Sequence, residues 1–198
     1  MSINREKKID SILHASLKVL ATKGYENATI ADISKAAHVS RGILHYYFSD
    51  KEDLVSKTLA MSSNSLIQSI LIEVKRNSAE EVVDDMLDGF IMNLQQHPDF
   101  FAFLFEMWCA SRRSKKIRHE LEICVEKVVN AIQGLLKSTR EDDITNFDLE
   151  ESKEKARALL ALSDGIAFHL LLNPDHINFK DRKFWLQIKS MMLAILKR

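Results

Sequence analysis

Between residues 41 and 47 the sequence gathers side chains that can contact nucleic acid. Arg41, His45, Tyr46 and Tyr47 fall in this short stretch, together with the small residue Gly42. An arginine can donate two hydrogen bonds to one guanine edge or to a phosphate, and a tyrosine hydroxyl can donate to a phosphate oxygen. A helix that exposes these groups suits the major groove of DNA. The stretch therefore predicts a DNA-reading helix, in which Arg41 contacts either a base or only a phosphate.

Two short predicted helices would position these side chains. Thr29 followed by Asp32 has the spacing of a reciprocal N-terminal cap, and Ser40 is a suitable cap for the helix that begins at Arg41. The tight turn at residues 38–39 separates the two helices. Short helices joined in this way are typical of a helix-turn-helix, whose second helix enters the major groove.

The rest of the chain also has the pattern of helices. Apolar residues recur at helical spacing from residue 5 to residue 23 and in most later segments, and the chain holds only 5 Gly and 2 Pro. We therefore expect an all-α fold of about nine helices without a strand. The expected division is a helix-turn-helix DNA-binding domain at residues 1–50 and a ligand-sensing and dimerisation domain at residues 51–198.

Charge is unevenly distributed, although the chain is neutral overall. Residues 1–48 hold seven Lys and Arg against four Asp and Glu, so the remaining residues sum to −3. A basic end on an otherwise acidic chain favours the approach of that end to DNA phosphates. The first residues lack the apolar core of a signal peptide, and no stretch is long and apolar enough to span a bilayer. We expect a cytoplasmic protein without a membrane partner.

The sequence offers no pattern of an enzyme site. Its seven histidines lack metal-ligand spacing, and no glycine-rich phosphate loop is present. The two cysteines, Cys109 and Cys124, have neither metal-site nor disulfide spacing. We therefore predict no catalytic residue, no metal and no cofactor.

One longer pattern extends over residues 24–54. It consists of Gly24–Tyr25, Thr29, Ile30–Ala31, Ala36–Ala37, Val39–Ser40, Gly42, Leu44, Tyr46–Phe48 and Lys51–Leu54. In this order and spacing the segment resembles the TetR family of transcriptional regulators. The resemblance implies phosphate contacts from Thr29, Tyr47 and Lys51, and a surface that faces base edges around the second helix. The predicted DNA-binding residues are Thr29, Ser40, Arg41, Gly42, Ile43, His45, Tyr46, Tyr47 and Lys51.

Two residues depart from the family pattern. His38 lies in the turn where the family usually has glycine, and histidine tolerates a positive φ better than most residues, at some strain. His45 replaces a common tyrosine. Its imidazole would contact a base or a phosphate in a way that depends on pH, or would lie on the helix surface as a neutral side chain. Both interpretations stay open.

Two later segments, residues 98–108 and 161–172, resemble the sensor domains of the group that contains the choline-responsive betaine-pathway repressors. Five aromatic residues fall in the first segment, and Asp164 and His169 interrupt apolar surroundings in the second. An apolar cavity with a few polar groups suits a small molecule, and a carboxylate beside aromatic rings would favour a cation. The pocket candidates are Phe90, Asn93, Phe105, Trp108, Asp164, Phe168 and His169.

These candidates also have a plainer structural interpretation. Any single aromatic side chain can be part of the core, and Asp164 can cap a neighbouring helix or pair with an arginine. The effector class therefore stays open between an apolar and a cationic small molecule.

The last two predicted helices carry apolar stripes that suit either the core or a partner surface. The family resemblance implies an interface of four helices from two copies of the chain, which matches a palindromic operator. The interface candidates are Leu159, Ser163, Ile166, Leu170, Trp185, Ile188, Met192 and Ile195.

These features predict a ligand-responsive homodimeric repressor. It would bind a palindromic operator in double-stranded DNA and leave it when a small molecule binds. Two alternatives remain: a transcriptional activator of the same family, and a helical protein that binds a small molecule or a partner without binding an operator.

Overall fold

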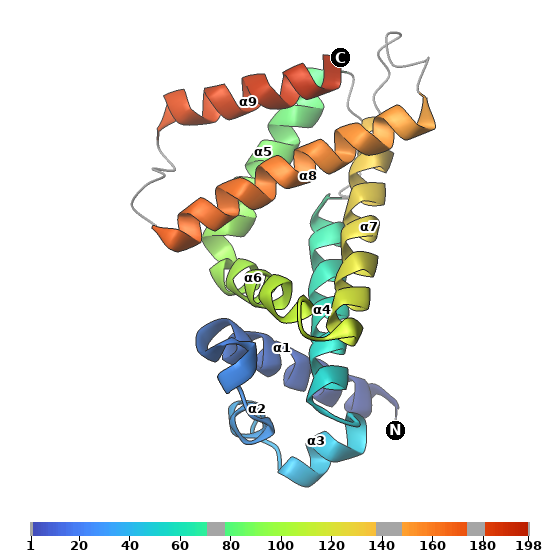
Figure 1. The fold of residues 1–198 in the computed structure, drawn as a ribbon, viewed down its shortest axis with the longest axis vertical. Coiled ribbons are helices and arrows are strands. Elements are labelled where there is room, and N and C mark those ends of the chain that lie inside the picture. Colours follow the sequence, from blue (N-terminus) through green and yellow to red (C-terminus); the bar gives the residue numbers. More distant parts are fainter. Residues whose placement is uncertain (1, 71–77, 138–147, 174–180, 198) are drawn as a thin grey trace. The chain divides into compact units, whose positions relative to one another are not determined.

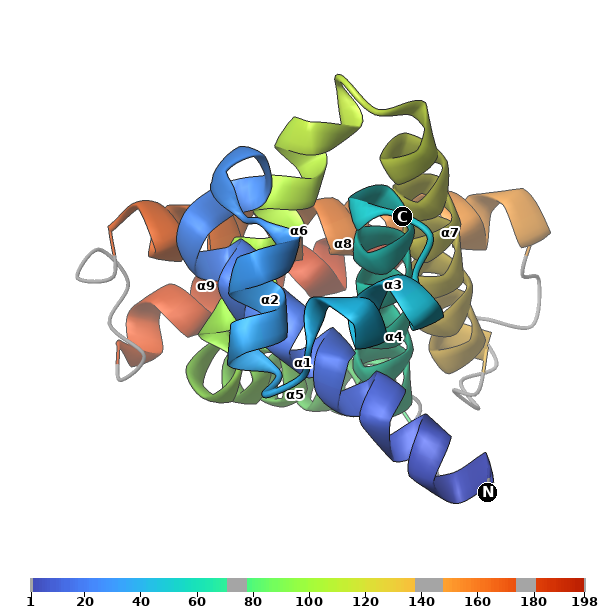
Figure 2. The same cartoon turned by 90° about the horizontal axis from the view of Figure 1, so that it is seen from below.

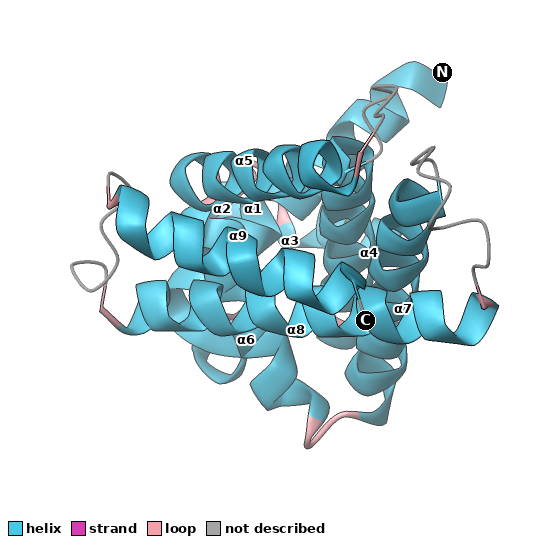
Figure 3. Ribbon diagram, turned by 90° about the horizontal axis from the view of Figure 1, so that it is seen from above, coloured by secondary structure: helices cyan, strands magenta, loops and turns pink. Residues whose placement is uncertain are grey.

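The computed structural model of the protein describes residues 2–70, 78–137, 148–173 and 181–197. Over these ranges the chain forms nine helices and no strand, which confirms the predicted all-α fold (Figures 1 and 3). In chain order the helices are α1 (Ser2–Asn27), α2 (Ile30–Ala36), α3 (Arg41–Tyr47), α4 (Lys51–Ile70), α5 (Ala79–Gln96), α6 (Pro98–Ser111), α7 (Lys115–Lys137), α8 (Leu149–Leu172) and α9 (Arg182–Lys197).

The chain packs into two compact units. The N-terminal unit comprises Met1–Asn64 and Asp99–Cys124, and the C-terminal unit comprises Ser65–Pro98 and Val125–Arg198. Helices α4 and α7 therefore each begin in the N-terminal unit and end in the C-terminal unit. Packing thus places α6 and the first half of α7 with the predicted helix-turn-helix, although some fifty residues separate them along the chain. The predicted functional boundary at residue 50 stays a prediction.

Two clusters of buried apolar side chains stabilise the N-terminal unit. The first joins α1, α2 and α3 to the start of α4, and it consists of Ile12, Leu13, Ile33, Ala37, Leu44, Phe48 and Leu54. The second joins α1 and α4 to α6 and α7, and it consists of Leu20, Ala28, Val55, Leu59, Phe103, Met107, Ala110, Ile117, Leu121 and Cys124. Helices of only seven residues such as α2 and α3 are unstable alone, so they depend on the first cluster.

Helix α1 changes direction at Gly24, where the backbone has φ 75° and ψ 164°. A residue with a Cβ seldom adopts these angles. The Tyr25 N–H, which the bend frees from helix bonding, donates to Glu106 Oε2 on α6 over 2.9 Å. A Cβ at Gly24 would lie 2.9 Å from the same oxygen, which is the end of a flexible side chain, so the backbone angles are what require glycine here.

The C-terminal unit contains α5, α8, α9 and the second half of α7. Helix α9 packs against both α5 and α8, and Figure 3 shows these three helices running across the unit. Lys189 of α9 forms an ion pair of 2.5 Å with Asp84 of α5. The Gln133 amide on α7 donates to the Leu149 carbonyl oxygen at the start of α8, over 2.9 Å. These polar contacts join helices whose apolar faces form the interior of the unit.

No described helix is long and apolar enough to cross a membrane.

Candidate nucleic-acid interface

The first residues of α2 form a closed hydrogen-bond arrangement. The Asp32 N–H donates to Thr29 Oγ1 over 3.1 Å, and the Thr29 N–H donates back to Asp32 Oδ2 over 3.0 Å. The Thr29 hydroxyl donates to the same carboxylate over 2.7 Å, and Lys23 Nζ lies 2.6 Å from its other oxygen. The contacts with Lys23 and Thr29 lower the pKa of Asp32 to about 2. Both donors of Thr29 are therefore engaged, and the predicted phosphate contact would require one of them to leave Asp32.

Helix α3 buries one face and exposes the other. Ser40 caps it, since the Ile43 N–H donates to Ser40 Oγ over 3.3 Å. Leu44, which is 1% exposed, lies in the first apolar cluster, whereas Arg41, Gly42 and His45 are exposed and Tyr46 is 76% exposed. The structure thus brings these predicted contact residues together on the exposed face of α3, the helix that is labelled in Figure 2.

Two residues set the backbone around α3. His38 has a φ of 54°, and it is the single non-glycine residue with a positive φ among the described residues. The turn is closed by the Val39 N–H, which donates to the Ser34 carbonyl oxygen over 3.0 Å. A Cβ at Gly42 would meet only Ser40 Oγ, at 3.8 Å. Nothing within the described chain requires glycine at position 42, which fits a close approach by a ligand from outside.

Lys51 points toward the end of α1 and not into solvent. Its ammonium donates to the Tyr25 carbonyl oxygen and lies 4.5 Å from the centroid of the Tyr25 ring. Partial burial lowers the pKa of Lys51. No sequence pattern indicates this contact, because residues 25 and 51 meet only when α4 packs beside α1. A phosphate bound by Lys51 would have to share the ammonium with Tyr25.

Tyr47 is half-buried beside a cation that is not among the predicted DNA-binding residues. The Arg5 guanidinium carbon lies 5.8 Å from the centroid of the Tyr47 ring, and the Tyr46 ring makes an edge contact at 5.0 Å. Arg5 therefore holds the ring of a predicted phosphate contact in place. The signal in the sequence was the basic start of α1, where Lys7 and Lys8 follow Arg5.

The seven pocket candidates divide between the two units. Phe105 and Trp108 lie on α6 in the N-terminal unit, and Trp108 is exposed. The other five lie on α5 and α8 in the C-terminal unit: Phe90, Asn93, Asp164, Phe168 and His169. On α5 the Asn93 side chain donates to the Gly89 carbonyl oxygen over 2.8 Å. The predicted pocket therefore stays a prediction.

Asp164 is the most unusual of these candidates. Burial raises its pKa to about 6. No ion pair or side-chain hydrogen bond joins it to another residue in the described ranges, so neither an arginine nor a helix end there explains it. On the same helix, the Phe168 and His169 rings lie 6.1 Å apart. A half-buried carboxyl without a partner is a common feature of ligand sites.

The structure places most of the dimer-interface candidates inside the protomer. The buried ones are Leu159, Ile166, Leu170, Trp185, Ile188 and Met192, and Ser163 and Ile195 are half-buried. The apolar stripe that the sequence showed on each helix is therefore the face that packs within the C-terminal unit. An interface on α8 and α9 would have to use other positions of the same helices.

Comparison with protein families gives two matches that together cover most of the chain. Residues 12–58 match the family described as bacterial regulatory proteins, tetR family. Residues 79–183, more than half of the chain, match the family described as the C-terminal domain of BetI-type transcriptional repressors. The first match contains α2 and α3 with their exposed face.

Individual proteins agree with these matches. The chain is 27% identical over 185 residues to the HTH-type transcriptional regulator PksA of Bacillus subtilis, covering 91% of this chain and 86% of PksA. It is 26% identical over 168 residues to the regulator BetI of Escherichia coli, covering 83% of this chain and 80% of BetI. Salmonella enterica GusR has a similar fold, with a TM-score of 0.78 and 18% identity over 97% of this chain and 96% of the other.

Proposed function

Because this chain belongs to the TetR family of transcriptional regulators and carries a BetI-type C-terminal domain, we propose that it is a repressor which binds a palindromic operator as a homodimer. A small molecule bound to the C-terminal domain would release it from DNA. Family membership confirms the predicted identity as a DNA-binding transcriptional regulator that is not an enzyme.

The exposed face of α3 carries the proposal. Leu44 and Phe48 fix the helix from inside, and Arg41, His45 and Tyr46 point outward together. Such an arrangement suits a recognition helix, because its exposed side chains are not used to stabilise the core of the unit. Gly42 leaves room for a base or a sugar to approach the backbone.

The proposed dimer uses the outer face of α8 and α9. An exposed stripe of small and apolar residues follows α8 at helical spacing, and it consists of Ala158, Ala161, Gly165, Phe168 and Leu172. On α9, Leu186 is 54% exposed and lies on the same face as Leu193. Small residues allow two helices to approach closely, and exposed Phe and Leu supply apolar area for burial.

Phe168→Glu should therefore turn a dimer into a monomer in sedimentation velocity, and a monomeric wild-type protein would contradict the dimer.

The proposed effector site includes Asp164. A cationic ligand would gain an attractive partner there and would hold the carboxyl ionised. We therefore expect a quaternary ammonium probe to raise the melting temperature of the wild-type protein but not that of Asp164→Asn. An uncharged probe of the same shape that stabilises both proteins equally would favour the apolar class of effector.

The proposed release is a shift between two populations of the protein. Helices α4 and α7 pass from one unit into the other, and Glu106 on α6 holds the bend of α1 through the Tyr25 N–H. A ligand that changes the tilt of α4 would change the spacing of the two recognition helices, which must match half-sites about 34–36 Å apart. A coupling of about 1–3 kcal/mol would weaken DNA binding roughly 5–150-fold.

The experiment that tests this function is selection of random duplex DNA, then of genomic fragments, on the purified protein at fixed salt. Enrichment of one palindrome supports a dimeric operator-binding regulator. In the genomic fragments, the position of that palindrome relative to the promoter distinguishes a repressor from an activator. Selection should fail with an Arg41→Ala, Tyr46→Ala double variant that remains folded. A folded wild-type protein that enriches no sequence at low salt would contradict the proposal and favour binding of a ligand or partner alone.

A further inference from the structure

The turn between α6 and α7 is strongly basic. Five of the seven residues from 112 to 118 are Lys or Arg, His119 follows, and no Asp or Glu lies between residues 107 and 119. All six basic side chains are exposed. We call this set the basic turn; it consists of Arg112, Arg113, Lys115, Lys116, Arg118 and His119. The predicted DNA contacts do not include any of them.

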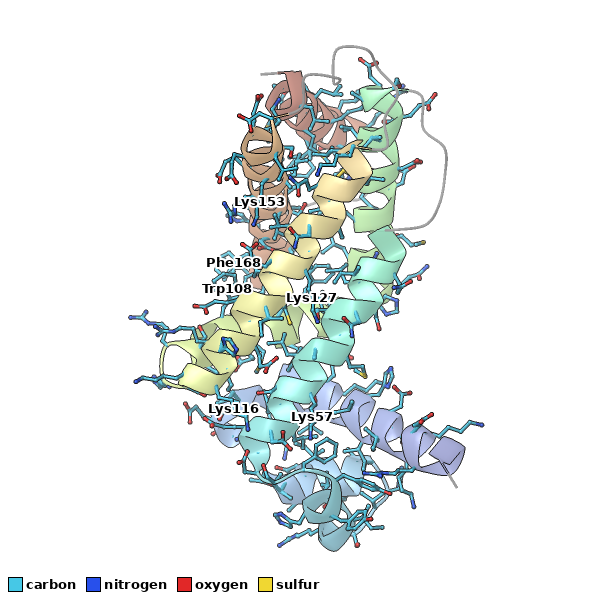
Figure 4. The ribbon with its side chains drawn as sticks, turned by 90° about the vertical axis from the view of Figure 1, so that its right-hand side faces the viewer. Lys57, Trp108, Lys116, Lys127, Lys153 and Phe168 are labelled. Atoms are coloured by element: carbon cyan, nitrogen blue, oxygen red, sulfur yellow. The ribbon has the colours of Figure 1, made fainter. Side chains whose placement is uncertain are left out.

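Two ion pairs attach the basic turn to the helix-turn-helix. Arg113 Nη1 lies 2.9 Å from Glu26 Oε1, just before the start of α2. Lys116 Nζ lies 3.7 Å from Asp50 Oδ1, just after the end of α3. The side chain of Lys116 is labelled in Figure 4. The basic turn therefore runs beside the two ends of the DNA-reading element, within the same compact unit. In the view of Figure 2 the turn between α6 and α7 extends beyond α2 and α3.

The other Lys and Arg side chains of the basic turn have no acidic partner among the described residues. No carboxylate in those ranges lies within ion-pair distance of Arg112, Lys115 or Arg118. Arg118 Nε donates to the Ser111 carbonyl oxygen over 3.1 Å, which orients the side chain without neutralising it. At least three positive charges are therefore exposed and accessible to an anion from outside the chain.

The stability of α7 does not explain these charges. The positive end of a helix dipole lies at its N-terminus, where acidic side chains stabilise and basic ones destabilise. Among the described helices, α2, α4, α5, α6 and α8 have an acidic residue in the first turn. Helix α7, like α1, α3 and α9, has none, and it begins with Lys115 and Lys116. Basic residues in the first turn, where acidic residues are preferred, are expected when their charges contribute to binding.

The overall charge of the unit agrees with an anionic partner. The N-terminal unit holds 14 Lys and Arg against 11 Asp and Glu, a net charge of +3. Because the chain is neutral, the C-terminal unit carries −3. The partner of the basic turn should therefore be one that already approaches the N-terminal unit.

We propose that the basic turn binds the sugar–phosphate backbone of DNA beside each half-site, as a second contact surface of the N-terminal unit. This inference rests on the proposed DNA binding by α3. Phosphate contacts carry no sequence information, so the basic turn would strengthen binding to the operator and to other DNA by the same factor. Binding through it would weaken steeply as salt concentration rises.

The test compares two variants of equal charge. Arg112→Gln, Lys115→Gln, Arg118→Gln removes the unpaired cations, and Lys127→Gln, Arg182→Gln, Lys183→Gln removes three exposed cations of the C-terminal unit. The dissociation constant is measured over a salt series for two duplexes: the palindrome recovered by selection and a random sequence. Circular dichroism checks that both variants are folded.

The basic-turn variant should bind both duplexes more weakly by the same factor. Its salt slope should fall by about 0.9 for each phosphate that the variant no longer neutralises. The control variant should behave as wild type. A basic-turn variant with wild-type affinity and slope, or with a decrease in affinity no larger than that of the control, would overturn the inference. So would a decrease confined to the palindrome, because it would mean that the turn reads bases.

The same measurements separate this inference from the proposed operator binding. If wild type prefers no sequence, but the basic-turn variant binds random DNA more weakly, phosphate binding by the basic turn is supported and operator binding is contradicted. If wild type binds the palindrome tightly and the basic-turn variant has the same affinity, operator binding is supported and phosphate binding by the basic turn is contradicted. A wild-type protein that binds neither duplex would overturn both.

Discussion

Two aspartates, one in each unit, have opposite surroundings. At the start of α2, Asp32 forms an ion pair with Lys23, and its pKa is lowered to about 2. On α8, Asp164 has no partner in the described ranges, and burial raises its pKa to about 6. The first arrangement keeps its charges fixed at neutral pH, whereas the second responds to small changes in pH or to a bound cation.

This difference fits the proposed division of tasks between DNA binding near α3 and ligand sensing at Asp164. A DNA-reading surface needs a fixed shape and fixed charges, and the contacts of Asp32 with Thr29 and Lys23 supply both at the start of α2. A sensing site needs a group whose state a ligand can change, so an unsatisfied carboxyl is useful there. Substitutions near α3 and at Asp164 should therefore change the free energy of unfolding by different amounts and in opposite directions.

The largest effect is expected when the support of α3 is removed. Leu44→Ala should lower the free energy of unfolding by about 2–5 kcal/mol, since Leu44 is almost fully buried in the cluster that stabilises both short helices. Tyr46→Ala, at a neighbouring exposed position, should change it by less than about 0.5 kcal/mol while weakening operator binding. Urea unfolding and fluorescence anisotropy measure the two quantities. Equal destabilisation by both variants would mean that the exposed face is structural.

The next effect concerns Asp164 and pH. Because its pKa is raised from 3.8 to about 6 in the folded state, the folded protein binds the proton more tightly, and stability is lost as pH rises through this range. Asp164→Asn should therefore be more stable than wild type at pH 7, by on the order of 2 kcal/mol. The difference should shrink toward zero near pH 4. Thermal unfolding from pH 4 to 7.5 tests this, and a difference independent of pH would contradict it.

Glycine substitutions should have opposite effects in the two units. Gly24→Ala should destabilise by about 1–3 kcal/mol, because it forces a Cβ into a region of φ and ψ used mainly by glycine and against the Glu106 carboxylate. Gly134→Ala, in the middle of α7 with open space around it, should stabilise by about 0.5–1 kcal/mol. Denaturant midpoints measure both. If Gly134→Ala destabilised the protein, the prediction would be wrong, and the added methyl group would have to contact another part of the protein.

The smallest effect is expected at the turn before α3. His38→Gly should raise the free energy of unfolding by about 0.5–1 kcal/mol, since glycine adopts a φ of 54° without the strain of a Cβ. Operator affinity should stay within a factor of two to three if His38 only shapes the turn. A large decrease in affinity with increased stability would show that the imidazole itself contacts DNA.

Residues close together in the chain determined much of the fold on their own. Helical spacing of apolar residues and the scarcity of Gly and Pro predicted nine helices, and the Thr29–Asp32 cap formed as expected in the described structure, because such signals act within one or two turns. The exposed set around Arg41 and Tyr46 was also predictable, since a helix of seven residues has few positions and the apolar ones mark its inner face.

Contacts between distant segments were decided only by the tertiary structure. An apolar stripe such as that of Leu159 and Trp185 looks the same whether it faces a core or a partner, and packing assigned it to the interior of the C-terminal unit. The bond of Glu106 with the bend of α1, and the approach of the basic turn to Glu26 and Asp50, join residues more than sixty positions apart. No local pattern encodes such pairs, because the chain meets itself there only after both clusters of the N-terminal unit have formed.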